Sequence, residues 1–175
     1  MFAKILIGVV LLIAAILLYA TTKPDNFSVK RVITIKSSPE KVAALINDFH
    51  RWGTWSPWEK IDPELKRTFT GPAAGVGSIY EWEGNSKVGA GRMEVLQSSP
   101  AQVTIKLDFI KPFEGHNTAQ FDLTSQDQST VVTWTMFGPS TFITKVMQVF
   151  TSMDSLIGKD FEAGLANMKA AAEAQ

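Results

Sequence analysis

Residues 102–124 read QVTIKLDFIKPFEGHNTAQFDLT, and they carry the clearest indication of the fold. From Val103 to Phe109 every second residue is apolar, and the same alternation returns from Ala119 to Leu123. A period of two is typical of a strand with one buried face and one solvated face. The two halves follow each other closely, so they predict neighbouring antiparallel strands.

The alternation extends in both directions from this stretch, with turn-forming residues at Gly84-Asn85, Ser99-Pro100 and 126–128. Short alternating segments joined by turns favour an antiparallel meander over βαβ units. Gly89 and Gly91 indicate a bulge or sharp curvature. We predict six strands here: Leu65–Thr70, Gly77–Trp82, Gly89–Gln97, Gln102–Phe109, Gly115–Thr124 and Thr130–Phe137.

The flanking segments predict one more strand and two helices. Phe27–Ile35 alternates like the meander, and Ser38 and Pro39 are a typical helix start for a helix over Pro39–Phe49. After Gly138 the apolar period changes to three or four, which predicts one long amphipathic helix from Phe142 to about Ala172, bent at Gly158. The order indicates an α+β fold, with a curved antiparallel seven-stranded sheet wrapped around the C-terminal helix.

Composition limits the function classes. The 175 residues suit a single domain with an appendage, and 45% hydrophobic content is enough for a core. The 17 basic and 17 acidic residues cancel, which argues against nucleic acid as a partner. The absence of cysteine excludes disulfides, thiolate metal ligands and a thiol nucleophile.

The N-terminus carries a membrane signal. Ile5 to Ala20 is an unbroken apolar run, and a helix over residues 2–20 would be about 28 Å long, close to the thickness of a bilayer core. We predict a transmembrane anchor over residues 1–20, a linker over 21–26, and a domain over 27–175. The alternative is a secretory signal cleaved near Ala20, but the run is long for one and Leu18 is not the small residue expected there.

Only the N-terminal residues bear on which side of the membrane the domain lies. Basic residues flank the apolar run on both sides, at Lys4 and at Lys23, so the charge rule gives no orientation. The very short, positively charged N-terminus resembles an export signal. We therefore expect a single pass through the membrane with an extracytoplasmic domain.

A pocket between the last helix and the sheet would be lined by large side chains. By alternation and helical spacing, the side chains that would line it are Tyr80, Trp82, Met93, Phe109, Asn117, Phe121, Trp134, Met136, Phe150 and Met153, with Trp55 and Trp58 at its mouth. Packing of Trp52, Trp55 and Trp58 onto the sheet edge is the simpler interpretation of those three. Arg31 also faces inward by parity, and it requires a carboxylate of the protein or a ligand head group.

Three stretches carry a family resemblance: RWGTWSPW over 51–58, GVGSIYEW over 75–82 and GKDFEAGL over 158–165. Together with the element order, they make residues 27–172 resemble the START-like (SRPBCC) superfamily, and more narrowly the bacterial polyketide cyclase/dehydrase-like proteins. The resemblance implies a helix-grip fold with a hydrophobic ligand cavity, and a bacterial cytoplasmic membrane as the location of the anchor. It does not imply catalysis, because the superfamily contains both carriers and enzymes.

Catalytic and metal motifs are not evident. His50 and His116 are the only histidines and lack ligand spacing, and no Gly-x-Ser-x-Gly elbow occurs. The glycine-rich segment 71–77 precedes a strand and not a helix, so a turn is favoured over a phosphate loop. We predict no catalytic residues, no metal and no cofactor.

The leading hypothesis is therefore binding or transfer of a lipid-like or aromatic molecule by a membrane-tethered protein. A cyclase or dehydratase acting in the same cavity is the first alternative, and it would need an ionisable group inside the pocket. A membrane-anchored scaffold with a filled interior is the second. The sequence predicts no oligomeric state.

Overall fold

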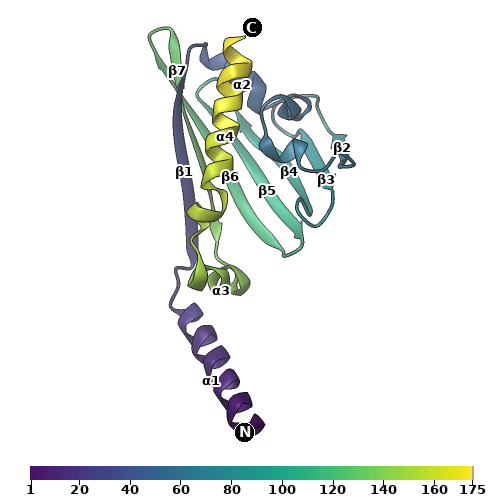
Figure 1. Ribbon diagram of the computed structural model, residues 1–175. Coiled ribbons are helices and arrows are strands. Elements are labelled where there is room, and N and C mark those ends of the chain that lie inside the picture. Colours follow the sequence, from purple (N-terminus) through teal and green to yellow (C-terminus); the bar gives the residue numbers. More distant parts are fainter. Residues whose placement is uncertain (175) are drawn as a thin grey trace.

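A curved, fully antiparallel sheet of seven strands forms the frame of the domain (Figure 1). The computed structural model describes residues 1–174. The strands lie in the order β1-β7-β6-β5-β4-β3-β2, so that each strand after β1 pairs with its successor and β7 closes back onto β1. Their bounds are β1 Asn26–Ile35, β2 Lys66–Thr70, β3 Ile79–Glu83, β4 Ala90–Ser98, β5 Gln102–Lys111, β6 Gly115–Gln126 and β7 Ser129–Pro139.

The predicted α+β class and meander are confirmed, and strand ends differ by a few residues. The register brings the inward-facing residues of neighbouring strands together. Phe121 of β6 stands opposite Val103 of β5 and Trp134 of β7. Because the side-chain period in a strand is two, this register places an apolar layer on one face of the sheet.

Three short helical segments follow β1 in the chain. Helix α2 spans Pro39–Ile46, and the Ser38 hydroxyl accepts a hydrogen bond from the backbone N–H of Lys41, as predicted for a capped start. The helix ends at Ile46, three residues earlier than predicted, because Asp48 starts a separate turn by accepting from the N–H of His50. The 3₁₀ segments η1 (Phe49–Thr54) and η2 (Pro57–Lys60) follow.

The prediction of one continuous C-terminal helix was wrong. The segment forms two helices, α3 over Phe142–Phe150 and α4 over Met153–Glu173, and Gly158 lies within α4. Thr151 and Ser152 have extended backbones between them, and the Ser152 hydroxyl accepts from the N–H of Ser155 to cap α4. A capping serine thus begins a new helix, which apolar periodicity alone does not reveal.

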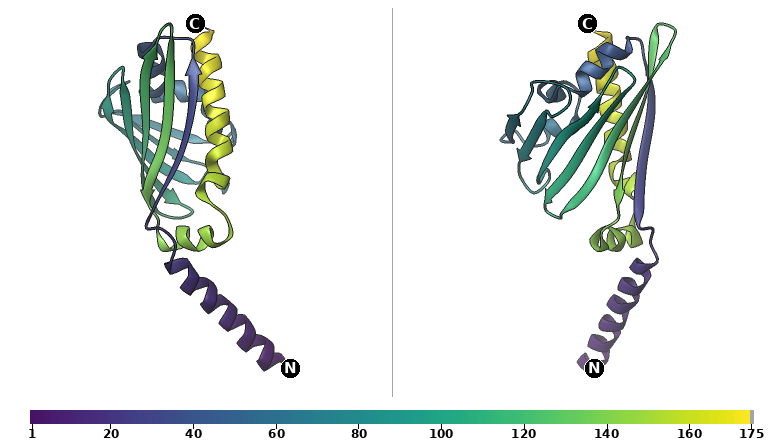
Figure 2. Two further views of the ribbon diagram at one scale, coloured as in Figure 1. Left: turned by 90° about the vertical axis from the view of Figure 1, so that its left-hand side faces the viewer. Right: turned by 180° about the vertical axis from the view of Figure 1, so that it is seen from behind.

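Helix α4 runs along the concave face of the sheet, while α3 lies across the end of the domain nearest the N-terminal helix (Figure 2). The core fills the space between α4, α2 and the sheet. Val103, Ile105 and Phe121 of the sheet and Phe161, Leu165 and Met168 of α4 are at most 2% exposed.

The N-terminal helix α1 covers Phe2–Thr21 and stands outside the domain (Figure 1). It is the one helix of the described residues that is long and apolar enough to cross a membrane, a property that a signal sequence shares. Its C-terminal end contacts α3, and Thr22–Asp25 connect it to β1.

Candidate ligand-binding site

A stack of aromatic rings joins α4 to the sheet at the centre of the domain. Phe161 of α4 lies 4.0 Å from Trp134 of β7, centroid to centroid, with an interplanar angle of 11°. Trp134 in turn stacks on Phe121 of β6 at 4.9 Å and 24°. Gly164 allows this approach, since a Cβ there would lie only 3.0 Å from the ring of Trp134. The helix is therefore seated directly on the inner face of the sheet.

Two tryptophans from the 3₁₀ segments pack edge-on against this stack: Trp55, which follows η1, and Trp58 of η2. Trp55 meets Trp134 at 5.6 Å in a T-shaped contact, and Trp58 meets Phe161 at 6.0 Å in the same way. The indole of Trp55 is fully buried and donates to the carbonyl of Leu45 at 2.9 Å. The packing interpretation thus holds for Trp55, and for Trp52, which is 4% exposed and donates to the carbonyl of Ile46.

Most of the side chains predicted to line a pocket are gathered around this stack. Buried members of the core are Trp55, Tyr80, Met93, Phe121, Trp134 and Met136. Partly buried residues that pack against it are Trp58, Trp82, Phe109 and Met153. Asn117 is also buried, on the inner face of β6.

Phe150 is the exception, because the prediction that it lines the pocket was wrong. It belongs to α3, its side chain is 71% exposed, and it lies outside the core. The continuous helix assumed from the sequence would have aligned Phe150 with Met153 on one stripe. The break at Thr151 and Ser152 ends that alignment.

The space under α4 is filled by these side chains. Two hollows, of about 220 Å³ and 370 Å³, stand out on the described part of the chain, and no residue of α4 lines either one. The first lies between Phe49, His50 and Phe69 and the second beside Ser38. The bulky residues predicted to wall a cavity under α4 pack against one another around the stack, so they occupy much of the space that the sequence assigned to the cavity.

One polar atom inside the stack has no partner. Among the described residues, the indole nitrogen Nε1 of Trp134 is the buried side-chain nitrogen or oxygen without a hydrogen bond. An unmade hydrogen bond of this kind costs about 1–3 kcal/mol. The N–H therefore offers a donor to any acceptor that reaches the aromatic layer.

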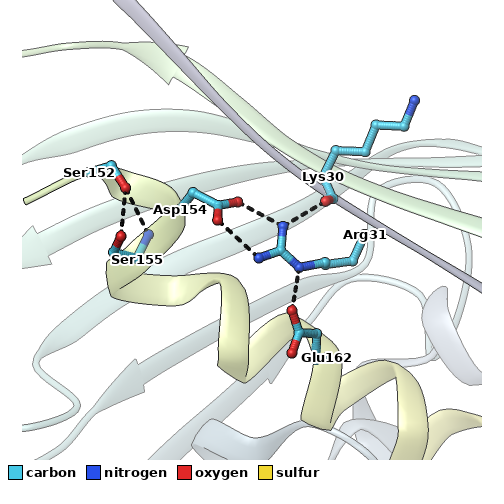
Figure 3. Close-up of polar contacts among 6 residues, drawn as sticks. All are labelled: Lys30, Arg31, Ser152, Asp154, Ser155 and Glu162. Atoms are coloured by element: carbon cyan, nitrogen blue, oxygen red, sulfur yellow. Dashed lines mark hydrogen bonds and ion pairs between the residues drawn. The ribbon is translucent and has the colours of Figure 1, made fainter.

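Arg31, the inward-facing charge of β1, is paired with carboxylates of the protein (Figure 3). Its guanidinium donates to Asp154 at 2.7 Å and to Glu162 at 2.7 Å, both on α4. These hydrogen bonds, the one to Asp154 first, raise the pKa of Arg31 above its ordinary value. Gly158 leaves the room for this contact, since a Cβ there would collide with the guanidinium. Arg31 thus ties the first turns of α4 to strand β1 at the sheet edge, and its charge is paired without a ligand head group.

A second polar group adjoins the core and was not predicted. The Tyr80 hydroxyl donates to a carboxylate oxygen of Glu59 at 2.6 Å, and the Arg67 guanidinium donates to the other oxygen at 2.7 Å. The Glu59 side chain is only 8% exposed. Burial first, and then the hydrogen bond to Glu59, raises the pKa of Tyr80 far above its ordinary value. Glu59 lies in a 3₁₀ segment, where no periodic pattern marks which residues face inward.

The histidines lie apart from the core. His50 stacks on Phe69 at 4.2 Å, and His116 is on the outer face of β6, where its Nδ1 lies 2.8 Å from Asp108. In residues 1–174 no group of three or more His, Asp or Glu side chains is arranged so that it could hold a metal ion. Both histidine side chains are exposed, His50 on η1 and His116 on the outer face of the sheet.

We predict that His116 titrates above the ordinary histidine pKa, because the hydrogen bond to Asp108 favours the imidazolium. A raised folded-state pKa contributes stability that is fully present below the unfolded-state pKa of about 6.5 and is lost as the pH rises through the folded-state value. An NMR titration of His116 in wild type and Asp108→Asn measures this. Identical titration curves for the two proteins would contradict it.

Comparison with known proteins shows the family of the chain and the solved structures that share its fold. Residues 26–173 match the family model described as "Polyketide cyclase / dehydrase and lipid transport". No curated protein matches the chain in sequence. Among solved structures, the fold is similar to the Zhui aromatase/cyclase from a Streptomyces species, with a TM-score of 0.59 and 12% identity over 85% of this chain and 94% of that one.

It is also similar to the major latex-like protein 151 of Panax ginseng, with a TM-score of 0.59 and 13% identity over 85% of this chain and 99% of that one. At these identities the likeness concerns the fold alone. The long α4 held by the curved sheet is the helix-grip arrangement that the sequence predicted. Because the family model covers nearly all of the domain, this chain belongs to the polyketide cyclase/dehydrase and lipid transport family of START-like proteins.

Proposed function

We propose that this protein binds a hydrophobic small molecule, lipid-like or aromatic, between α4 and the inner face of the sheet, while α1 anchors it in a membrane. Three facts support the proposal. The family description includes lipid transport, the surfaces that α4 and the sheet turn toward each other are apolar, and α1 is long and apolar enough to span a bilayer. We further propose that the domain lies on the extracytoplasmic side of a bacterial cytoplasmic membrane, since the apolar run with Lys4 near its start resembles an export signal.

The unpartnered N–H of Trp134 is the single observation that carries the proposal. An apolar body with one acceptor oxygen would replace side-chain contacts in the aromatic layer and complete this hydrogen bond at the same time. Ligands of this type are recognised by mostly apolar pockets with few, well-placed polar groups. The expected ligand is thus an apolar molecule with a carbonyl, ester or hydroxyl oxygen.

The aromatic stack packs directly against α4, so a ligand can enter between them only if the start of α4 moves away from the sheet. Asp154 and Glu162, which hold it to Arg31, are 58% and 60% exposed, so water can replace their ion pairs at little cost. The extended residues Thr151 and Ser152 separate this end of α4 from α3. Rotation of α4 about its better-packed second half would open the layer near Met153.

The enzymatic alternative has weaker support. Tyr80 is the ionisable member of the hydrophobic core, and its raised pKa keeps it protonated and unable to act as a base at neutral pH. Asp62 is buried as well, but its carboxylate already accepts from the backbone N–H groups of Glu64 and Asn85. The neighbouring carboxylate, Glu59, is already held by Tyr80 and Arg67. We therefore propose binding and not catalysis.

Photolabelling tests the proposal in the full chain. The protein is reconstituted in nanodiscs with a fatty acid methyl ester that carries a diazirine, irradiated and digested for mass spectrometry. We expect labelled peptides from β7 around Trp134 and from α4 around Phe161, in addition to α1. Labelling confined to α1 and α3 would overturn the proposal.

Trp134→Phe is the matched variant, because it keeps an aromatic ring at this position while it removes the N–H donor together with the second ring of the indole. Loss of one hydrogen bond, worth about 0.5–1.5 kcal/mol, should lower labelling of β7 and α4 by about 2- to 10-fold. Labelling of α1 should not change. Undiminished labelling of the interior would mean that the indole N–H does not hold the ligand.

A further inference from the structure

Helix α3 turns its polar side toward the domain and its apolar side outward. Lys145 is only 15% exposed and donates to Asp25 of the α1–β1 linker at 2.5 Å. Gln148 donates to the Ser140 hydroxyl at 3.3 Å. In contrast, Phe142 and Phe150 are 54% and 71% exposed. This is the reverse of the usual arrangement, in which an amphipathic helix buries its apolar face against the core.

The exposed residues form one continuous stripe. At 100° per residue, Phe142, Ile143, Met147 and Phe150 fall within an arc of about 140°, opposite the side that carries Thr144, Lys145 and Gln148. No residue of α3 is buried. A helix held by its polar residues and exposing its aromatic residues is suited to an apolar medium on its outer side.

The position of α3 next to α1 indicates that this apolar medium is the membrane. The end of α1 contacts α3, and only Thr22–Asp25 separate α1 from β1 (Figures 1 and 2). Four extended residues reach at most about 14 Å, so the domain cannot lift this end far from the point where α1 leaves the membrane. The tip of the β5–β6 hairpin belongs to the same end of the sheet, and its Ile110 and Phe113 are 57% and 54% exposed.

We infer that α3, with the tip of the β5–β6 hairpin, lies in the headgroup region of the phospholipid bilayer that α1 spans. The inference rests on the proposed membrane anchoring and goes beyond it, because it assigns a lipid-contacting surface within the domain. A lipid-like ligand would then enter α4 and the sheet directly from the bilayer, through the end of the domain that α3 covers.

The attraction is apolar and not electrostatic. Lys145 is paired with Asp25, and Lys111, next to Phe113, is paired with Glu83. Both cations are thus neutralised by partners on the protein. Docking should therefore occur on zwitterionic phosphatidylcholine and change little with salt.

Single-cysteine labelling tests the inference, since the chain contains no cysteine of its own. Three variants of the full chain, Leu11→Cys, Phe150→Cys and Gln128→Cys, each carry an environment-sensitive fluorophore in phosphatidylcholine nanodiscs at one copy per disc. Position 11 lies within α1, position 150 on α3, and position 128 in the β6–β7 turn at the opposite end of the sheet. A lipid with a nitroxide on its acyl chain near the headgroup serves as the quencher.

We expect strong quenching and a blue-shifted emission at positions 11 and 150, and an unquenched, water-like emission at 128. Quenching at 11 with no more at 150 than at 128 would overturn the docking of α3 and leave the anchor intact. Water-like emission at 11 would overturn the anchor and the docking together. Protection of position 150 only in discs with two copies would overturn the lipid contact in favour of self-association.

Discussion

Phe161→Ala should lower the free energy of unfolding by about 3–5 kcal/mol, the usual cost of truncating a buried phenylalanine. Phe161 is 1% exposed and stacks on Trp134 at 4.0 Å, so its removal leaves a hole between α4 and the sheet. The surrounding rings come from three separate elements and cannot all move in to fill it. Denaturation of the full chain in detergent micelles, followed by tryptophan fluorescence, measures the change.

Leu96→Ala is the control, since it truncates a large apolar side chain that is 50% exposed on β4, away from α3 and from the tip of the β5–β6 hairpin. It should change the free energy of unfolding by less than about 0.5 kcal/mol. Equal losses for the two variants would mean that the stack does not organise the core. A small loss for Phe161→Ala would instead indicate that the helix collapses onto the sheet when the ring is removed.

Trp55→Phe and Trp134→Phe should differ strongly although the chemical change is identical. In Trp55→Phe the fully buried carbonyl of Leu45 loses its donor, which adds about 1–3 kcal/mol to the cost of the smaller ring. In Trp134→Phe no hydrogen bond is lost, and a buried donor without a partner disappears. The second variant should therefore be the more stable by about 1–3 kcal/mol.

The same denaturation experiment compares the two variants without ligand. Equal stability would show that the N–H of Trp134 has a partner of its own, and would remove the observation that carries the proposed function. Together with photolabelling, this separates the two roles of the indole. Trp134→Phe should cost folding only the loss of the larger ring, without a lost hydrogen bond, and should also weaken ligand binding.

The strands were predictable because their signal is local. From Val103 to Phe109 the alternation of apolar and polar residues depends only on the two faces of a strand, and the structure has β5 and β6 within a few residues of the predicted ends. Ser38 and Pro39 likewise marked the start of α2, because a helix cap is formed by residues next to each other in the chain. The inward direction of Arg31 followed from the same parity.

The partners of these residues were not predictable. Arg31 meets Asp154 and Glu162 more than 120 residues later in the chain, and nothing local separates that outcome from a ligand head group. Glu59 was missed for the same reason, since its neighbours Tyr80 and Arg67 belong to strands that fold back on a 3₁₀ turn. Phe150 was misplaced because spacing alone does not show where one helix ends and the next begins.

Periodicity, caps and composition act over a few neighbouring residues, and they were enough to predict the seven strands, the class of fold, the family and the apolar N-terminal helix. They did not show whether the aromatic side chains enclose a space or fill it, or which way α3 faces. Both depend on the distance and angle at which α4 and α3 meet the sheet. Gly158, Gly164 and the two extended residues before α4 set that geometry, and their effect appears only when distant segments are packed together.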